Sequence, residues 1–286
     1  MAANAAALRG ITKQYKDFTL GPVDMTVPAG SIVGLIGENG AGKTTLLKIL
    51  CGVNRADDGT VDLLGGSPAD AATRAKIGVV FEDAFFYGSF TAAQVGRSLA
   101  GMCGERWNAD SFSAYLRRFG LDAGKKLKEY SRGMRLKLSL AAALAHDPEL
   151  LVLDEATAGL DPVVRGELMD LFLEFIQDER HSIIMSSHIT ADLEQVADSI
   201  AYLHNGQLLF HENKDALLQS YGVLRCGESV LPSLPADLVI FTKRGAFGCE
   251  SLVKDRAAVR ELLPDAVCDA ARLDDIMLFY SGRDAQ

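Results

Sequence analysis

The fold of this chain is decided by the stretch Gly37-Glu38-Asn39-Gly40-Ala41-Gly42-Lys43-Thr44-Thr45. Its spacing matches G-x-x-x-x-G-K-[ST], a loop that holds the phosphates of a nucleoside triphosphate. The glycines let the backbone turn its N–H groups inward, because glycine tolerates the backbone angles that this requires. We expect Lys43 to reach the β- and γ-phosphates and the Thr44 hydroxyl to bind Mg²⁺.

The residues on either side of this loop support the same prediction. Residues 31–36 are mostly apolar and predict a buried strand that enters the loop. Residues 45–50 open a helix, whose N-terminal dipole favours anions. A chance glycine loop between a strand and a helix is the alternative, and this context makes it much the weaker one. We therefore expect the chain to bind ATP or GTP.

A second apolar run, residues 150–153, ends in the acids Asp154 and Glu155. Such a run is typical of a buried strand in a parallel sheet, and ligands bind beyond the carboxyl ends of such strands. We expect Asp154 to hold Mg²⁺ directly or through water, and Glu155 to polarise the attacking water as a general base. The two acids could instead cap the next helix, which is the weaker interpretation beside a phosphate loop. The nucleotide is therefore expected to be hydrolysed.

The composition is that of a globular chain. Of its 286 residues, 48% are hydrophobic, which is enough for a sizeable core. No uninterrupted apolar segment reaches the roughly 18 residues that cross a bilayer. The alanine-rich N-terminus lacks the basic start of a secretory signal. The five cysteines are dispersed without a C-x-x-C pair, which is typical of small core residues in a reducing compartment. We expect a cytosolic protein.

The charge balance disfavours a nucleic-acid-binding surface. The chain carries 29 basic and 38 acidic residues, a formal net charge of −9, whereas nucleic acid is normally bound by a basic face. A local basic cluster of Lys125, Lys126 and Lys128 is interpreted as a solvated turn or helix face. No nucleic-acid partner is expected.

A short motif lies between the phosphate loop and the acidic strand. It reads Tyr130-Ser131-Arg132-Gly133-Met134 and precedes Asp154 by about twenty residues. By itself it could mark no more than a helix N-cap at Ser131. In this position the motif resembles the signature of the ATP-binding subunits of ABC transporters, which is usually Leu-Ser-Gly-Gly-Gln. The form Tyr-Ser-x-Gly-Met resembles the branch associated with drug, antibiotic and peptide exporters.

The resemblance covers roughly residues 5–220 and implies roles for further residues. It implies that Tyr15 stacks on adenine and that His188 contacts the γ-phosphate. It also implies that Asp161 lies at the end of a loop through which the two subunits contact each other. Tyr15 could instead be ordinary strand packing, and His188 a structural residue. The motifs occur in the family's order and with its spacing, which makes the resemblance specific.

Two positions depart from the family's pattern, and Glu82 is the first. It stands where the family has a glutamine that touches Mg²⁺ and the attacking water and links the site to the transmembrane partner. A carboxylate is an acceptable Mg²⁺ ligand, but it adds negative charge near the γ-phosphate and Glu155. We interpret Glu82 as a metal-binding and catalytic residue that alters hydrolysis or its coupling. A tolerated exchange of little consequence is an equal alternative.

Arg132 is the second departure, because it stands where the signature usually has glycine. Ser131 and Gly133, which the resemblance implies as donors to the γ-phosphate, are both present. We expect the motif to work, with the arginine pointing away from the phosphate or adding positive charge to it.

The strand and helix patterns predict an α/β fold. The strands expected in an antiparallel sheet are residues 7–15, 23–27 and 59–64. The helices expected before the signature are residues 91–102, with Thr91 as N-cap, and residues 110–119. The strands and helices of an expected βαβ arrangement are residues 150–154, 163–177, 182–187, 191–197 and 199–203. A hairpin turn leads into a strand at residues 208–211, and residues 274–280 predict a terminal helix.

The resemblance implies a P-loop NTPase core with a RecA-like parallel sheet and an antiparallel β subdomain. We expect this ATP-binding domain to span residues 1–221 and to include a helical subdomain that carries the signature at about 83–147. Residues 222–286 are expected to form a small C-terminal accessory region of helices and strands. A role in dimerisation, a gate on activity and a plain additional layer are all compatible with this region.

An aromatic concentration follows Glu82 directly. Phe85, Phe86, Tyr87 and Phe90 could form a pocket for a helix of a membrane partner, since aromatic residues are enriched in such anchors. Ordinary packing within the helical subdomain is the other interpretation, and it is the more common use of aromatic side chains.

The resemblance also implies how such a chain works. Two subunits face one another head to tail, and each ATP-Mg²⁺ is held by residues 37–45 of one chain and residues 131–133 of the other. We therefore expect a homodimer or a paralogous ABC ATPase, bound to transmembrane permease subunits at the inner face of the cell membrane. A soluble ABC ATPase that acts on nucleic acid, ribosomes or cofactor assembly is the alternative. The single nucleotide-binding unit and the lack of a basic face, a zinc spacing or a long coiled-coil insertion disfavour it.

Overall fold

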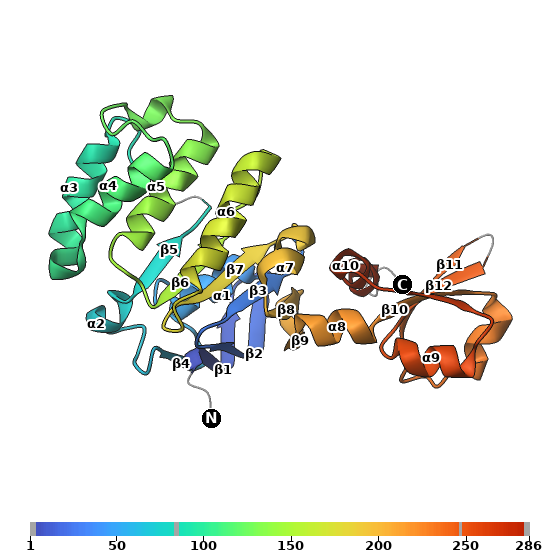
Figure 1. Cartoon of the computed structure of the whole chain (residues 1–286). Helices are drawn as coiled ribbons and strands as arrows, with labels where there is room; N and C mark the ends of the chain where they lie inside the picture. The colour runs from blue at the N-terminus through green and yellow to red at the C-terminus, as the bar shows by residue number, and fades with distance from the viewer. Residues whose placement is uncertain (1–3, 83–85, 246–247, 283–286) are drawn as a thin grey trace.

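A six-stranded sheet forms the centre of the molecule (Figure 1). The computed structural model describes residues 4–82, 86–245 and 248–282. The strands, in the order β5-β6-β7-β3-β8-β9, are β5 (Ile77–Val80), β6 (Leu150–Asp154), β7 (Ser182–Ser187), β3 (Ile32–Ile36), β8 (Ser199–His204) and β9 (Gln207–Asn213). The pairs from β5 to β8 are parallel, and β9 joins β8 as an antiparallel hairpin. The expected parallel sheet is confirmed.

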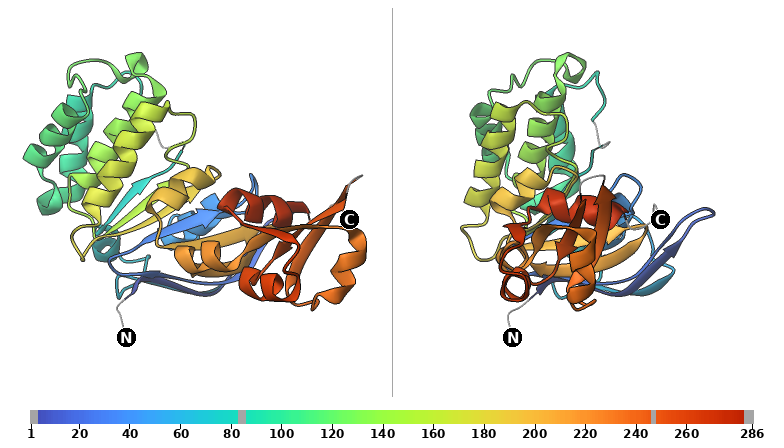
Figure 2. Two further views of the ribbon diagram at one scale, coloured as in Figure 1. Left: turned by 45° about the vertical axis from the view of Figure 1, so that its right-hand side comes forward. Right: turned by 90° about the vertical axis from the view of Figure 1, so that its right-hand side faces the viewer.

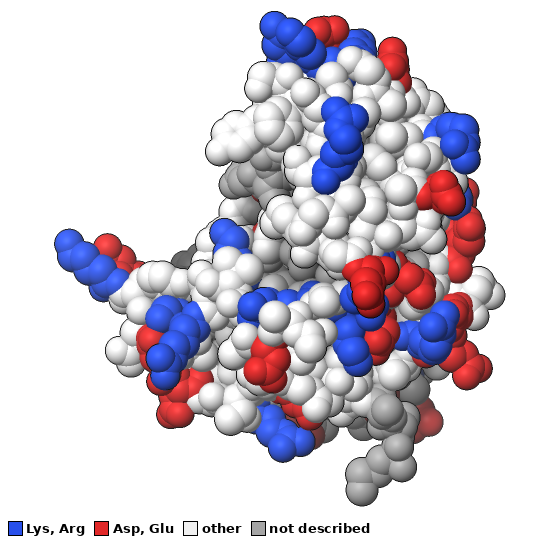
Figure 3. Space-filling view, turned by 90° about the vertical axis from the view of Figure 1, so that its left-hand side faces the viewer, with Lys and Arg blue, Asp and Glu red and all other residues white. Residues whose placement is uncertain are grey.

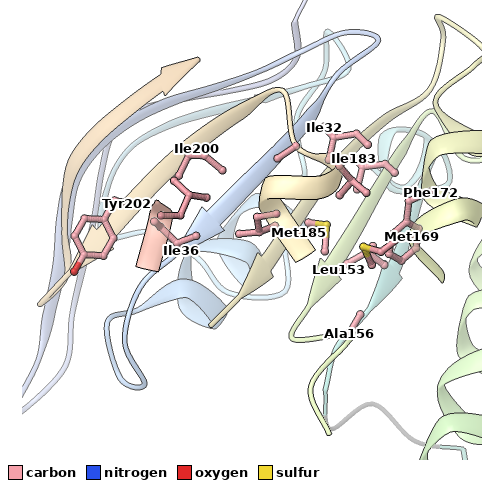
Figure 4. Packing of buried hydrophobic residues seen from close by; sticks show 14 of the residues in the cluster. Ile32, Ile36, Leu153, Ala156, Met169, Phe172, Ile183, Met185, Ile200 and Tyr202 are labelled. Atoms are coloured by element: carbon pink, nitrogen blue, oxygen red, sulfur yellow. The ribbon is translucent and has the colours of Figure 1, made fainter. Parts of the chain in front are cut away.

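Both faces of this sheet are buried, which explains its continuous apolar strands. Ile32 and Ile36 of β3 belong to one core, whereas Val33 and Leu35 belong to the other, because side chains alternate along a strand. The first core includes side chains of helix α6 (Pro162–Phe175), as Figure 4 shows for Phe172. The carboxyl ends of the strands are therefore held between two packed layers.

The second core joins the central sheet to an antiparallel sheet of three strands. These strands, in the order β2-β1-β4, are β1 (Asn4–Gln14), β2 (Thr19–Pro28) and β4 (Asp58–Leu63). Leu8 and Val23 of this sheet pack in one cluster with Leu46 and Leu50 of helix α1 (Lys43–Leu50). The antiparallel sheet predicted from sequence is confirmed, and it lies against the helix that follows the phosphate loop.

A group of helices stands at one end of the molecule (Figures 1 and 2). Its members are α3 (Ala92–Cys103), α4 (Ala109–Arg118) and α5 (Arg132–Leu144). Thr91 caps α3 as expected, in a capping box with Gln94. Asn108 caps α4, so that this helix begins one residue before the predicted start. Phe112 and Leu138 belong to the shared core of the group.

The chain after β9 passes through helix α8 (Lys214–Ser220) into a second antiparallel sheet. Its strands, in the order β11-β12-β10-β13, are β11 (Val239–Gly245), β12 (Gly248–Val253), β10 (Gly222–Cys226) and β13 (Val267–Ala270). Helix α9 (Arg256–Leu262) packs on this sheet. The terminal helix α10 (Leu273–Ser281), predicted at 274–280, returns to lie against α7 (Thr190–Val196) (Figure 1).

Helix α10 shares the core of the central sheet. Ile276 and Phe279 are buried in the same cluster as Leu193 and Val196 of α7. The Thr190 hydroxyl donates a hydrogen bond to Asp274, next to the start of α10. The C-terminal region is thus joined by packing to the helix that follows His188.

Within the described residues, no helix is long and apolar enough to cross a membrane. The aromatic residues that follow Glu82 divide between two environments. Phe86 and Phe90 pack against the core of the helical group, whereas Tyr87 is 77% exposed. Phe85 lies outside the described residues.

Candidate nucleotide-binding site

The loop between β3 and α1 has the backbone of a phosphate-binding loop. Gly42 caps α1 with a φ of +105°, and Gly40 has a φ of +84°. Residues with side chains rarely adopt these left-handed angles, so the glycines are required there. The first turn of α1 contains no acidic residue, and the positive end of the helix dipole therefore faces the loop unopposed.

Lys43 lies within the curve of this loop. Its side chain is 6% exposed, and its ammonium donates hydrogen bonds to the backbone oxygens of Gly37 at 2.7 Å and Glu38 at 3.1 Å. The same ammonium forms an ion pair with Glu155, with Nζ 3.3 Å from Oε1. A buried, oriented cation beside helix amides is suited to bind a phosphate.

A chain of hydrogen bonds connects α1 to the ends of β6 and β7. The Thr44 hydroxyl donates to Asp154 Oδ2 at 2.7 Å, and the Ser186 hydroxyl donates to Asp154 Oδ1 at 2.6 Å. Asp154 is 2% exposed, so this carboxylate depends on its donors. A hydroxyl and a carboxylate are oxygen ligands of the kind that Mg²⁺ prefers, and the arrangement therefore fits a bound magnesium ion.

Glu155 follows β6 and turns back toward β7. Its φ of +49° is unusual for a residue with a side chain, and its N–H donates to Ser186 Oγ at 3.0 Å. The carboxylate oxygen Oε2 lies 2.6 Å from His188 Nδ1 and accepts a longer bond of 3.3 Å from the His188 N–H. These contacts, with the Lys43 ion pair, fix the direction of the carboxylate.

An open cleft of about 460 Å³ lies over the loop. Its walls are formed by residues of the phosphate loop together with side chains from the turn between β1 and β2, from α1 and the segment after it, and from the segments that follow β5 and β6. They are Tyr15, Phe18, Glu38, Asn39, Gly40, Gly42, Lys43, Thr44, Thr45, Lys48, Asn54, Glu82 and Glu155. Tyr15 is 46% exposed, with its ring centroid 6.4 Å from that of Phe18. An exposed ring at the edge of a cleft over the phosphate loop is available to stack on a base.

The signature residues occupy a different place. Ser131 caps α5 and accepts a hydrogen bond from the Met134 N–H at 3.2 Å. Asp161 caps α6 in the same way, with its Oδ1 accepting from the N–H groups of Val163 and Val164. Ser131, Gly133 and Asp161 are not among the described residues that line the cleft. The structure therefore brings together only part of the site predicted from sequence. The phosphate loop, the two acids, His188, Tyr15 and Glu82 lie around the cleft, and the signature residues lie elsewhere.

Arg132 donates a hydrogen bond from Nη2 to Glu82 Oε1 at 2.9 Å. The sequence predicts the arginine either away from the phosphate or as added charge, and it gives no sign that Glu82 is its partner. Phe18, Asn54 and Ser186 are further site residues that the sequence did not predict. Only Ser186 carried a signal, because it is a polar residue in a strand of otherwise apolar character.

Cys51, which ends α1, is not a reactive thiol. Burial, together with the nearby negative charge of Asp154, raises the pKa of the Cys51 thiol to about 12. The thiol therefore stays protonated near neutral pH and acts as a small core side chain.

Comparisons with known proteins agree with this geometry. The family model described as "ABC transporter" matches residues 20–158. The lantibiotic transport ATP-binding protein SrtF of Streptococcus pyogenes is 31% identical over 240 residues, which cover 83% of this chain and 98% of that protein. The chain belongs to the ABC transporter ATP-binding proteins. The expected family, fold class and nucleotide binding are confirmed.

Other members of the family differ in how much of their length is matched. The bacitracin transport ATP-binding protein BcrA of Enterococcus faecalis is 36% identical, over 71% of this chain and 67% of that protein. An uncharacterized ABC transporter ATP-binding protein of Synechocystis is 38% identical, and the match spans 58% of its length. A solved structure of the ATP binding subunit of an ABC transporter superposes with a TM-score of 0.68 at 27% identity, over 74% of this chain and 91% of that one.

Proposed function

We propose that this chain hydrolyses ATP to energise an ABC-type membrane exporter, and that two nucleotide-binding subunits close on ATP and open after hydrolysis. The observation that supports this most is the separation of the site into two parts. The cleft gathers the phosphate loop, Asp154 and Glu155, whereas Ser131 and Gly133 lie outside it. A second chain would have to bring its own signature to complete the site.

In this proposal, ATP binds along the cleft. Tyr15 stacks on adenine, the backbone of residues 37–45 surrounds the phosphates, and Lys43 contacts the β- and γ-phosphates. Thr44 and Asp154 hold Mg²⁺, with Glu82 on the cleft wall as a further oxygen ligand. When held by these residues, the metal ion would supply positive charge that offsets the charge developing on the phosphoryl group.

The hydrolytic step falls to Glu155 and His188. Glu155 orients the attacking water and accepts its proton. His188 holds the Glu155 carboxylate through Nδ1 and its backbone N–H, and it would contact the γ-phosphate through the rest of the ring. The ion pair between Lys43 and Glu155 ties the base to the phosphate-binding cation, so binding and base position are linked.

The signature and Asp161 act toward the partner chain. Ser131 and Gly133 of one subunit would donate to the γ-phosphate held by the other, and Asp161 would contact the opposite subunit. We assign residues 1–221 to the ATP-binding domain, with the helical subdomain at about 83–147, and residues 222–286 to an accessory region. Two copies of this chain, or one copy with a paralogue, would form the pair.

The export role is supported by relatives whose names describe bacitracin and lantibiotic transport. We propose that transmembrane permease subunits bind the chain at the inner face of the membrane. A soluble ABC ATPase acting on nucleic acid is the second candidate. Lys and Arg alternate with Asp and Glu on the face shown in Figure 3, which offers no basic surface there.

A pull-down from host membranes tests this proposal. Tagged Glu155→Gln protein, solubilised with ATP and Mg²⁺, should recover a polytopic membrane protein in stoichiometric amount. Lys43→Ala protein, which should bind ATP much more weakly, serves as the control and should recover less. Recovery of soluble partners alone, from a preparation that still binds ATP, would favour the soluble ATPase.

A further inference from the structure

The two residues that depart from the family's pattern contact each other. Glu82 follows β5, Arg132 begins α5, and 50 residues separate them in the sequence. Arg132 Nη2 donates to Glu82 Oε1 at 2.9 Å. A glutamine at 82 would remove the charge of this acceptor, and a glycine at 132 would remove the donor. Arg132 therefore supplies the positive charge that Glu82 needs as a partner, and Glu82 supplies the charged acceptor for Arg132.

Glu82 lies where a negative charge matters for the nucleotide. It lines the cleft together with Lys43 and Glu155. It also lines a smaller hollow behind the cleft, with Asp154, Glu155 and Arg132 among the lining residues. Three carboxylates thus share one region, and Lys43 is already paired with Glu155. An unpaired Glu82 would repel the phosphates of an incoming nucleotide.

Arg132 reaches Glu82 along the loop that follows β6. A Cβ atom built on Gly159 would lie 3.3 Å from Arg132 Nη1 and 3.5 Å from Cζ, so the missing side chain leaves room for the guanidinium. Arg132 itself lies between Ser131 and Gly133. One side chain therefore joins the signature, the loop after β6 and the wall of the nucleotide cleft within a single chain.

The ion pair between Arg132 and Glu82 contributes little to the folding stability of the chain. Both side chains are about half exposed, 51% for Arg132 and 46% for Glu82, and ion pairs of this kind contribute little to folding. Local charge at the cleft, where an anion must bind, is the property that the pair changes.

We propose that Arg132 is a positioning residue that holds and neutralises the Glu82 carboxylate at the mouth of the nucleotide cleft. The two residues that depart from the family's pattern, Arg132 and Glu82, therefore act as a matched pair in ATP binding. This inference rests on the proposed function of the cleft. It predicts that Arg132 acts on nucleotide affinity only through Glu82, and that removing the acid removes the need for the arginine.

A double-mutant cycle tests the coupling. The affinity of the full chain for a fluorescent ATP analogue is titrated in EDTA, so that no metal competes for the Glu82 carboxylate. Arg132→Gln should weaken binding by about three- to tenfold. Arg132→Gln combined with Glu82→Gln should return to within about twofold of wild type, because the uncompensated charge is gone. Arg132→Lys, which keeps the charge, should stay close to wild type.

An exposed pair away from the cleft provides the matched control. Arg118 and Glu174 join α4 to α6 at 2.6 Å, and Arg118→Gln with Glu174→Gln should leave the affinity unchanged. Raising the salt concentration should shrink the difference between Arg132→Gln and wild type, because charge effects at exposed sites are screened.

The inference would be overturned by either of two results. Equal losses in Arg132→Gln and in the double variant would mean that Arg132 acts through α5 and not through Glu82. Wild-type affinity in Arg132→Gln would mean that the pair has no part in binding. Failure of the wild-type chain to bind the analogue at all would instead contradict the proposed function.

Discussion

The phosphate-binding half of the cleft and the signature segment are built in opposite ways. Lys43 and Asp154 are almost fully buried and fully engaged by hydrogen bonds and ion pairs within the chain. Ser131 and Arg132 are exposed at the start of α5. The first region is organised before any ligand arrives. The second displays its polar groups on a surface.

This contrast shows how one chain divides a site. Buried polar groups must find partners within the fold, so the phosphate-binding half can be assembled by folding alone. Exposed helix N-termini have no such requirement, and they remain available to another molecule. Substitutions in the two regions should therefore fail differently. Those in the phosphate-binding half should lose nucleotide binding, whereas a change at Ser131, which lies outside the cleft, should keep binding and lose hydrolysis, which requires the closed pair. Arg132 differs from Ser131 because it contacts Glu82 on the cleft wall.

The largest effect on ATP affinity is expected for Lys43→Ala. This change removes the cation that the loop orients, and ATP affinity should fall by about 100-fold, which corresponds to about 2.7 kcal/mol. Lys48→Ala is the matched control, because Lys48 lies on the same helix and lines the same cleft, but its ammonium lies over the Phe81 ring. Its loss should be below about fivefold. Isothermal titration measures both, and equal losses would remove the special role of Lys43.

Glu155→Gln should separate binding from hydrolysis. The amide keeps the shape of the side chain but cannot accept a proton, so the rate of ATP hydrolysis should fall by about 100- to 1,000-fold. ATP binding should persist, and size-exclusion chromatography in ATP should show a dimer. The same variant with Lys43→Ala should stay monomeric. A hydrolysis rate within about threefold of wild type would contradict the assignment of Glu155 as the base.

Ser131→Asn probes the exposed half. Asparagine is as good an N-cap as serine, so α5 should keep its stability, while the bulkier amide obstructs contact with a facing nucleotide. We expect ATP affinity of the monomer within about twofold of wild type and hydrolysis reduced at least about tenfold. Thr91→Asn, the equivalent change at the cap of α3, should leave hydrolysis intact. Loss of monomer affinity in Ser131→Asn would contradict the division between the two halves.

The smallest effect is expected outside both halves, at the contact between α10 and α7. Asp274→Ala removes the acceptor of the Thr190 hydroxyl and should cost about 1 kcal/mol. This corresponds to a fall in melting temperature of about 2 °C, with ATP affinity unchanged. Asp265→Ala, at an exposed position, should leave the melting temperature unchanged. A large loss of ATP affinity in Asp274→Ala would place the C-terminal region within the binding half.

The parts of the site that sequence predicted are those encoded by contiguous residues. The phosphate loop, the strand that ends in Asp154 and Glu155, and the cap at Thr91 all depend on neighbours in the chain, and the structure has them where they were expected. The roles that come from the resemblance stay predictions.

Other features depend on packing between distant segments. The bond between Arg132 and Glu82 spans 50 residues, and the support that Ser186 gives Asp154 spans 32. The first bond requires the helical group to be placed against the sheet, and the second requires β6 and β7 to pair in register. Neither arrangement can be predicted from a local sequence pattern. The return of α10 to α7 is of the same kind, because an amphipathic helix can be predicted from sequence while its partner cannot.

Mixing two inactive variants tests the central claim, that each complete site needs the loop of one chain and the signature of another. Lys43→Ala and Ser131→Asn chains are combined in equal amounts, and ATP hydrolysis is measured against each variant alone. A mixed pair contains one site with an intact Lys43 and an intact Ser131. About half the pairs are mixed and each has one intact site, so activity should reach about a quarter of wild type.

The control for the mixing experiment is the chain that carries both Lys43→Ala and Ser131→Asn. It can supply neither an intact loop nor an intact signature, so adding it to either single variant should restore nothing. Recovery of activity only in the mixture of the two single variants is the predicted result. A mixture that stays at the level of the separate variants, while wild type hydrolyses ATP, would contradict a site shared between two chains.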